Sequence, residues 1–178
     1  MIVVGLLAAP LSAPVIEVAR RAAAAGARVE ALGLVPGTVE WDEALFDLTA
    51  AGVGHATVAR SARPLIEPAD LDLALRYLPD IRCVVLVAPP ARLLATALSG
   101  ADFASSPLVV VGPLDGDALA ALESRDRTAT PIILQPPADD PDGTFAGFVA
   151  ALAVRLDAGE SPEAAFDATV ASLAVDPA

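Results

Sequence analysis

Three short runs of the sequence are apolar from end to end, and they constrain the fold more than any other feature. Ile2–Leu7, Cys83–Val87 and Leu108–Val111 consist almost entirely of Val, Leu and Ile, without alternating polar residues. A strand with one face in water alternates, so an unbroken run indicates a strand that is covered on both faces. The runs therefore predict a mostly parallel sheet with helices on both of its faces.

The segments between these runs carry helical spacing, so strands and helices alternate along the chain. Further strands are predicted at 28–34, 56–59 and 131–134. Helices are predicted at 15–25, 41–51, 69–78, 92–98, 118–124, 145–156 and 162–173. This alternation is typical of a doubly wound α/β domain, and we expect one such domain over residues 1–178.

The balance of charge limits the partners that the chain can have. The eleven basic residues are all Arg, and 23 acidic residues bring the net charge to −12. A surface this acidic repels phosphate backbones and anionic membranes, so we expect neither a nucleic acid nor a membrane as partner. The same field opposes ATP unless a local site overrides it. No apolar run reaches the ~18 residues of a membrane span. The single cysteine, Cys83, cannot form a disulfide within the chain, so we expect a cytoplasmic protein.

The mean hydropathy is high for a chain with so few aromatic residues. It reaches +0.60, while Phe, Trp and Tyr together make up 4% of the chain. Either the core buries its Ala, Val and Leu very efficiently, or some apolar surface is covered by a partner. We expect a homodimer for this reason.

Cysteine and histidine each occur once, which limits redox and metal chemistry. Cys83 lies inside a predicted strand and is interpreted as a small buried apolar residue. His55 follows Gly54 and is placed in a loop. With one residue of each kind, the chain cannot assemble a zinc site from the usual soft ligands, and we predict no metal site.

The C-terminal stretch 142–166 resembles the end of ribokinase-type (PfkB-type) carbohydrate kinases. In that family a G-A-G-D-[ST]-F segment opens a long helix, and a turn with glycine and an Ala-rich helix follow. Thr144, Phe145 and Gly147 stand where the family pattern has them. The resemblance weakly covers most of the chain and implies a ribokinase-like fold. Little sequence separates Gly52 from the helix at 69–78, so the family's lid is expected to be reduced or absent.

The family motif implies a phosphoryl-transfer site at the start of the 145–156 helix. Backbone N–H groups there form an anion hole, the motif's Asp is the general base, and ATP is used with Mg²⁺. In this chain Gly143 occupies the position of that Asp and cannot accept a proton. If any activity remains, the resemblance implies Asp142 as the base, with Gly143 and Thr144 as nucleotide-binding backbone donors.

The acidic residues before this helix allow two interpretations. Asp139, Asp140 and Asp142 could supply a general base or a Mg²⁺ site, or they could cap the helix and interact with its dipole. Three carboxylates crowd the place where a phosphate would bind. At an effective dielectric constant of ~20, two like unit charges 4 Å apart repel by about 4 kcal/mol. Capping is the simpler interpretation.

Three functional hypotheses follow from these features. The first is a PfkB-type carbohydrate kinase homologue with lost or much reduced phosphotransferase activity, which would be an ATP-dependent sugar kinase if active. The second is a non-catalytic module of the same fold that binds a small molecule, such as a sugar or a nucleotide, or serves oligomerisation. The third is an unrelated flavodoxin-like binder of small molecules.

Overall fold

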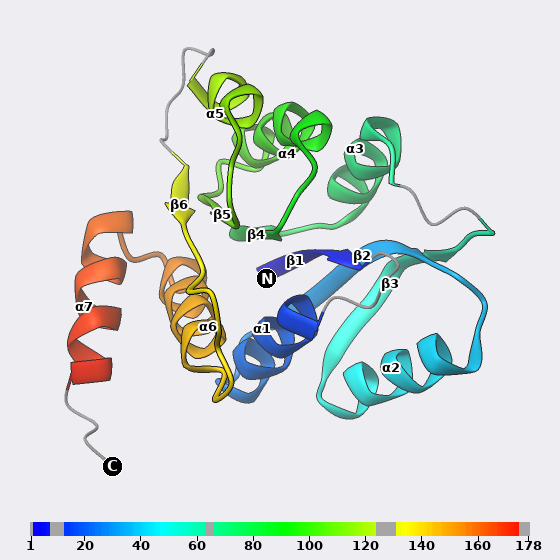
Figure 1. The fold of residues 1–178 in the computed structure, drawn as a ribbon, viewed down its shortest axis with the longest axis horizontal. Helices are drawn as coiled ribbons and strands as arrows, with labels where there is room; N and C mark the ends of the chain where they lie inside the picture. The colour runs from blue at the N-terminus through cyan, green and yellow to red at the C-terminus, as the bar shows by residue number, and fades with distance from the viewer. Residues whose placement is uncertain (1, 8–12, 63–65, 124–130, 175–178) are drawn as a thin grey trace.

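The computed structural model describes residues 2–7, 13–62, 66–123 and 131–174, and in these ranges six strands form one sheet (Figure 1). All neighbouring strands run parallel, in the order β3-β2-β1-β4-β5-β6. The strands are β1 (Ile2–Leu7), β2 (Val29–Val35), β3 (Val53–Arg60), β4 (Cys83–Val87), β5 (Leu108–Val111) and β6 (Ile132–Leu134). The parallel sheet predicted from the apolar runs is confirmed.

Helices cover both faces of this sheet. In Figure 1, α3, α4 and α5 lie above it, and α1, α2, α6 and α7 lie below it. Their bounds are α1 (Ala13–Ala24), α2 (Val39–Ala50), α3 (Pro68–Tyr77), α4 (Ala91–Phe103), α5 (Gly116–Glu123), α6 (Thr144–Asp157) and α7 (Pro162–Ala174). The doubly wound α/β architecture is therefore confirmed, although Ser124, the predicted end of α5, lies outside the described residues.

The central strand β4 shows why the apolar runs have no polar alternation. Cys83, Val85 and Val87 pack into the core beneath the sheet, whereas Val84 and Leu86 pack into the core above it. Successive side chains of a strand point to opposite faces, so a strand between two helical layers must be apolar at every position. The same burial on both faces makes β5 fully buried.

Strand β3 is longer than predicted. It extends over Val53–Arg60 because its pairing with β2 begins at Val29 and Glu30, well before the expected start at residue 56. The prediction that His55 lies in a loop is therefore wrong: His55 lies on β3, with its Nε2 atom 2.9 Å from Thr49 Oγ1. Glycine at position 54 suggested a break, but pairing with β2 overrides this local preference.

Within the described ranges, no strand lies outside the single sheet. The helices of the same ranges include none with the length and apolar character needed to cross a membrane.

Candidate functional site

The start of α6 lies beside the carboxyl ends of the parallel strands, where ligands bind in open α/β sheets. The sheet order reverses between β1 and β4, and the crevice at such a switch point is the usual ligand site of this architecture. A cleft of about 920 Å³ opens there. We call it the switch-point cleft; its lining comes from α1, α2, the ends of β4 and β5, the loop 136–143 and the start of α6.

Two residues that directly follow strands of the sheet line the switch-point cleft and have unusual backbone conformations. Ala88 and Gly112 follow β4 and β5 directly, and both have positive φ angles, of 47° and 145°. The Ala88 N–H donates to Val111 O at 2.6 Å, and a Cβ atom on Gly112 would lie 3.2 Å from Ala88 Cα. Glycine at position 112 therefore lets the two strand ends approach closely. Both N–H groups are used within the chain, since the Gly112 N–H donates to Leu134 O at 3.0 Å.

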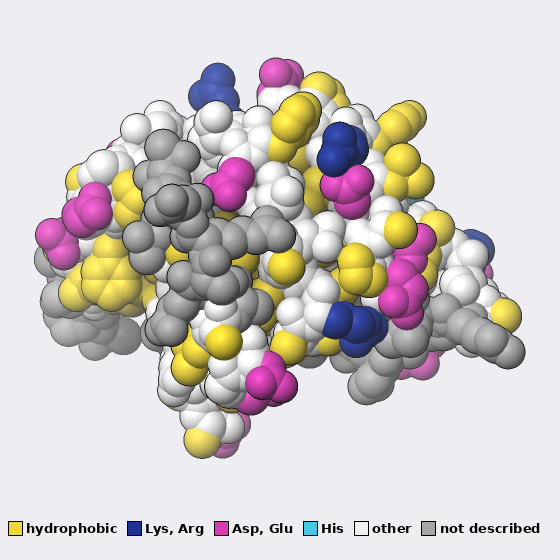
Figure 2. All heavy atoms as spheres, turned by 90° about the horizontal axis from the view of Figure 1, so that it is seen from above, with side chains coloured by type: hydrophobic (Ala, Val, Ile, Leu, Met, Phe, Trp, Pro, Cys, Tyr) yellow, Lys and Arg dark blue, Asp and Glu magenta, His cyan; other side chains and the backbone are white. Residues whose placement is uncertain are grey.

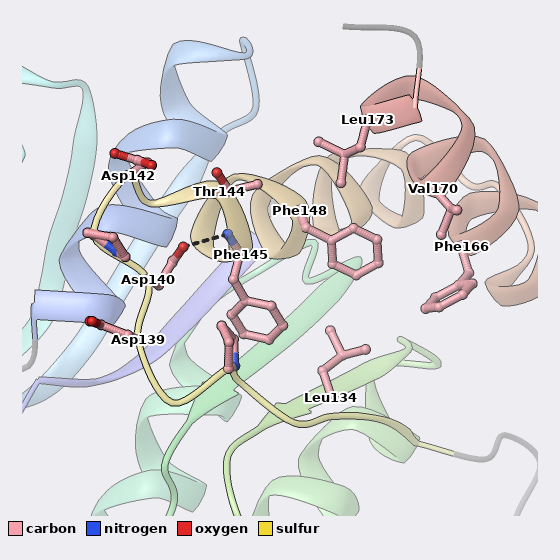
Figure 3. Close-up of a pocket in the computed structure, with 12 residues that line it drawn as sticks. Leu134, Asp139, Asp140, Asp142, Thr144, Phe145, Phe148, Phe166, Val170 and Leu173 are labelled. Carbon is pink, nitrogen blue, oxygen red and sulfur yellow. Dashed lines mark hydrogen bonds between the residues drawn. The ribbon is translucent and has the colours of Figure 1, made fainter. Parts of the chain in front are cut away.

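The backbone donors at the start of α6 are occupied by a carboxylate of the chain itself. Asp140 Oδ1 accepts from the Phe145 N–H at 3.0 Å (Figure 3). Asp140 Oδ2 accepts from the Ala146 N–H at 3.1 Å. The Gly143 N–H donates to the Asp140 backbone carbonyl at 3.1 Å. The first N–H groups of a helix need partners from outside the helix, and they attract anions. Asp140 satisfies two of them, which confirms the capping interpretation for this residue.

Gly143 has the left-handed conformation, and an arginine from another element covers it. Its φ angle is 66°, and a Cβ atom built on it would lie 2.6 Å from Arg21 Nη2. Arg21 comes from the last turn of α1, where its Nε pairs with Glu17 Oε1 at 2.6 Å and its Nη2 donates to the Asp142 carbonyl at 3.3 Å. The space into which the family's aspartate side chain would project therefore holds a guanidinium group.

The three candidate residues Asp142, Gly143 and Thr144 lie together around the first turn of α6. The carboxylate of Asp142 is exposed and points away from the start of α6, as does that of Asp139 in the same loop (Figure 3). Among the described residues, no three His, Cys, Asp or Glu side chains are arranged to hold a metal ion.

Sequence reasoning predicted that the acidic loop caps the helix, but it missed Arg21 and did not identify the two N–H groups that Asp140 accepts from. Arg21 lies 121 positions before the carbonyl to which it donates, and nothing in the local pattern of an Ala-rich helix marks such a contact. Asp140 lies five and six positions before the N–H groups that it accepts from, outside the spacing of an ordinary N-cap. Only the tight turn through Gly143 brings the carboxylate back onto the helix.

A second cleft lies between α6, α7 and the end of β6, and aromatic rings form its wall. Its volume is about 620 Å³, and three of the five Phe residues of the chain line it: Phe145, Phe148 and Phe166. The rings of Phe145 and Phe148 stack with centroids 6.5 Å apart, and Phe166 meets Phe148 edge-on at 5.6 Å. We call this the ring cleft; it begins where Asp140 caps α6 (Figure 3). Its described lining contains no basic side chain.

The fold matches solved structures of sugar and nucleoside kinases at low sequence identity. A fructokinase from Xylella fastidiosa with bound ATP has a TM-score of 0.63 and 12% identity, over 93% of this chain and 78% of that chain. Ribokinase from Arabidopsis thaliana, complexed with ribose and ATP, has a TM-score of 0.60 and 12% identity, over 96% and 86%. Adenosine kinase from Schistosoma mansoni, in complex with 2-fluoroadenosine, has a TM-score of 0.57 and 8% identity, over 92% and 78%.

Sequence comparison alone finds no such relationship. No protein-family model matches the chain, and no curated protein matches it. The TM-scores of 0.57 to 0.63 show a shared fold, whereas identities of 8–12% show nothing about the activity of this chain.

Proposed function

Because the chain has the ribokinase-like fold of PfkB-type carbohydrate kinases, we propose that it is a homologue of these kinases whose phosphotransferase activity is lost or much reduced. The observation that carries this proposal is the carboxylate of Asp140, which occupies the N–H groups of Phe145 and Ala146 at the start of α6. A phosphoryl group needs those donors, and here they serve an internal anion.

Electrostatics opposes a phosphate at this position. Asp139, Asp140 and Asp142 all lie in the loop that leads into α6, and Arg21, which contacts the loop, is paired with Glu17. Repulsion of about 4 kcal/mol for one pair of unit charges at 4 Å corresponds to a loss in affinity on the order of a thousandfold. Solvent reduces this value, but the phosphates of ATP bring several charges.

A well-placed general base for phosphoryl transfer is also missing from the start of α6. Gly143 has no side chain, and Arg21 covers the place where an aspartate side chain would project from it. Asp142, the remaining candidate base, directs its carboxylate away from the start of α6. A general base must lie within hydrogen-bond reach of the hydroxyl that it deprotonates, and a carboxylate directed away from the anion hole does not meet that condition.

The ring cleft supports retained binding of a small molecule. Aromatic side chains that line a concave site favour a flat apolar ring, and the absence of basic side chains from the lining disfavours phosphates. A nucleoside meets both conditions, and adenosine kinases share this fold. We propose that the ring cleft takes the base of a nucleoside-like ligand that carries no phosphate, while ATP and Mg²⁺ are not used.

A second candidate function is an oligomerisation module without a ligand. The observation that favours it is the number of large apolar side chains that stand exposed, among them Leu73, Tyr77 and Phe103. The two candidate functions are compatible in one molecule, because these side chains lie on α3 and α4, away from both clefts.

Measurements of ligand binding and of turnover distinguish the nucleoside-binding homologue from the oligomerisation module. We expect adenosine to raise the melting temperature of the purified chain more than ATP–Mg²⁺ does. Phe166→Leu should weaken the adenosine response, because it removes one ring and keeps an apolar side chain. Phe103→Leu is the matched control: it makes the same change on α4, where Phe103 is 77% exposed.

Phosphoryl transfer is measured with ATP–Mg²⁺, a panel of sugars and adenosine. We expect no ADP above the rate of the protein-free reaction. Robust phosphorylation of any acceptor would overturn the loss of activity. If adenosine leaves the melting temperature unchanged, the ligand proposal fails and the oligomerisation module remains.

A further inference from the structure

The outward face of α2 carries large apolar side chains that the described part of the chain leaves uncovered. Val39 and Phe46 are 73% and 72% exposed, and Ala50 is exposed as well. Seven residues make almost two full turns of an α-helix, so Val39 and Phe46 lie in one row, and Ala50 continues this row one turn further. We call this row, together with Glu43 inside it, the α2 stripe. None of its four residues lines either cleft.

The opposite face of α2 holds the helix on the sheet. Trp41 and Leu48, which are also seven residues apart, are buried in the core beneath the sheet. A surface helix ordinarily has one apolar face and turns polar residues outward. Helix α2 is apolar along two opposite rows, so the α2 stripe is not needed to attach α2 to its own chain. An exposed apolar row of this kind marks an interaction surface.

Every charged side chain of α2 is acidic. Glu43 lies within the α2 stripe, and Glu40 and Asp47 flank it on one side. Among the described residues, no basic side chain pairs with these three carboxylates, whereas Asp42, on the other flank, is paired with Arg60 of β3. The α2 stripe therefore combines an exposed aromatic ring with negative charge that the chain itself does not compensate.

An exposed aromatic residue on the other side of the molecule has a different electrostatic environment. Figure 2 shows the face formed by α3, α4 and α5, where Arg side chains stand among acidic ones. Arg76 of α3 pairs with Asp72 and lies over the ring of Phe103, 5.8 Å from its centroid. A positively charged partner would meet an arginine beside Phe103, whereas on the α2 stripe it would meet carboxylates.

We propose that the α2 stripe binds a basic amphipathic helix of another protein. The partner places an apolar side chain against Phe46 and Lys or Arg side chains against Glu40, Glu43 and Asp47. A row of side chains along one helix fits the groove between the rows of a second helix, and complementary charge around an aromatic residue favours such a contact.

The charge of α2 argues against other occupants of the same surface. A second copy of the chain would bring the same carboxylates and a net charge of −12 to the contact. Anionic membranes and nucleic acids would be repelled for the same reason. A basic protein segment is the occupant that the apolar row and the carboxylates both favour.

A synthetic amphipathic peptide of Leu and Lys tests the proposal without a ligand of either cleft. We expect this Leu–Lys peptide to shift the amide resonances of Phe46 and Ala50 in nuclear magnetic resonance spectra. A Leu–Glu peptide of the same pattern should leave them in place. Raising the ionic strength from ~0.15 M to ~1 M should weaken binding of the Leu–Lys peptide several-fold, because the Debye length falls from ~8 Å to ~3 Å.

Matched variants test whether the Leu–Lys peptide binds at α2. Phe46→Ala should raise its dissociation constant at least about tenfold, whereas Phe103→Ala, which removes an exposed ring from α4, should change it by less than about twofold. Glu43→Gln should also weaken binding, and Glu163→Gln, on an exposed position of α7, should not. All four side chains are exposed, so the variants should keep the far-ultraviolet circular dichroism of wild type.

A Leu–Lys peptide that leaves the Phe46 and Ala50 amides in place would overturn the proposal. Equal losses of affinity in Phe46→Ala and Phe103→Ala, or in Glu43→Gln and Glu163→Gln, would also overturn it, because the peptide would then respond to the chain's overall charge or apolar surface and not to the α2 stripe.

Discussion

At the scale of single residues, the candidate site is defined by a substitution and by the two side chains around it. Gly143 stands where the resembled kinases carry an aspartate, Arg21 lies over it, and Asp140 occupies the donors that a phosphate would use. The carboxylate stabilises α6 in the way that a bound anion would, through two hydrogen bonds to the first turn. Asp140 thus contributes to stability at the position where the proposed function expects a phosphoryl site to have been lost.

Replacing Asp140 separates its stabilisation of α6 from its occupation of the N–H donors. Asp140→Ala should lower the free energy of unfolding by about 1–2 kcal/mol, since it removes the partner of two N–H groups. It should also raise the affinity for ATP–Mg²⁺, because the donors become free and one negative charge is lost. Asp139→Ala removes the same charge from the same loop, yet no helix N–H donates to that side chain among the bonds described. The affinity of each variant for ATP–Mg²⁺ is measured by calorimetry. Equal gains in affinity for the two variants would mean that the lost charge, and not the freed N–H groups, causes the gain.

The lone cysteine makes stability depend on pH in the alkaline range. Burial raises the pKa of the Cys83 thiol far above its ordinary value. The folded chain therefore keeps the proton while the unfolded chain loses it, so the stability is complete below the unfolded pKa and falls as the pH rises above it. We expect a loss of about 1 kcal/mol per pH unit above ~pH 9. Urea unfolding of wild type and Cys83→Ala at pH 7 to 10 measures the difference; parallel slopes for the two chains would refute it.

At the scale of elements, the contact between α3 and α4 depends on a glycine in the middle of a helix. A Cβ atom on Gly100 would collide with Leu75 Cδ1 and would lie 3.3 Å from Leu75 Cβ. Leu75 is buried in the core above the sheet, so it has little room to give way. Close helix packing therefore outweighs the intrinsic cost of glycine in a helix, which is about 1 kcal/mol relative to alanine.

Two glycine-to-alanine substitutions test this packing. Gly100→Ala should destabilise the chain by about 1–3 kcal/mol through overpacking. Gly147→Ala, inside α6, should be neutral or stabilising by up to ~1 kcal/mol, because its Cβ would meet only the flexible end of Arg21 at 3.4 Å. Thermal unfolding of the two variants gives the comparison, and a gain in stability for Gly100→Ala would show that α3 and α4 are less closely packed than described.

At the scale of the whole molecule, the architecture could be predicted from the sequence and the site could be predicted only in part. The unbroken apolar runs predict strands buried on both faces, and helical spacing such as that of 145–156 predicts the intervening helices. Both signals are local in the sequence. The extension of β3 through Gly54 and His55 depends on pairing with β2, and pairing partners are not encoded locally.

One part of the candidate site can be read from neighbouring residues in the sequence, and another part depends on packing between distant segments. Glycine at position 143, where the resemblance implies an aspartate, can be read directly from the sequence. The position of Arg21 over Gly143 depends on the packing of α1 against α6, which lie more than 100 residues apart. Whether a helix N-terminus is open or occupied is decided by such packing and by the turn before it, and neither can be read from residue types.

Nuclear magnetic resonance of the amide groups at the start of α6 tests most directly whether the anion site is occupied. The Phe145 and Ala146 amides are followed while ATP–Mg²⁺ is added to wild type and to Asp140→Ala. We expect both resonances to stay in place in wild type and to shift in Asp140→Ala, where the donors are free. Shifts of both amides in wild type, at concentrations that saturate the variant, would contradict the occupation of the site by Asp140.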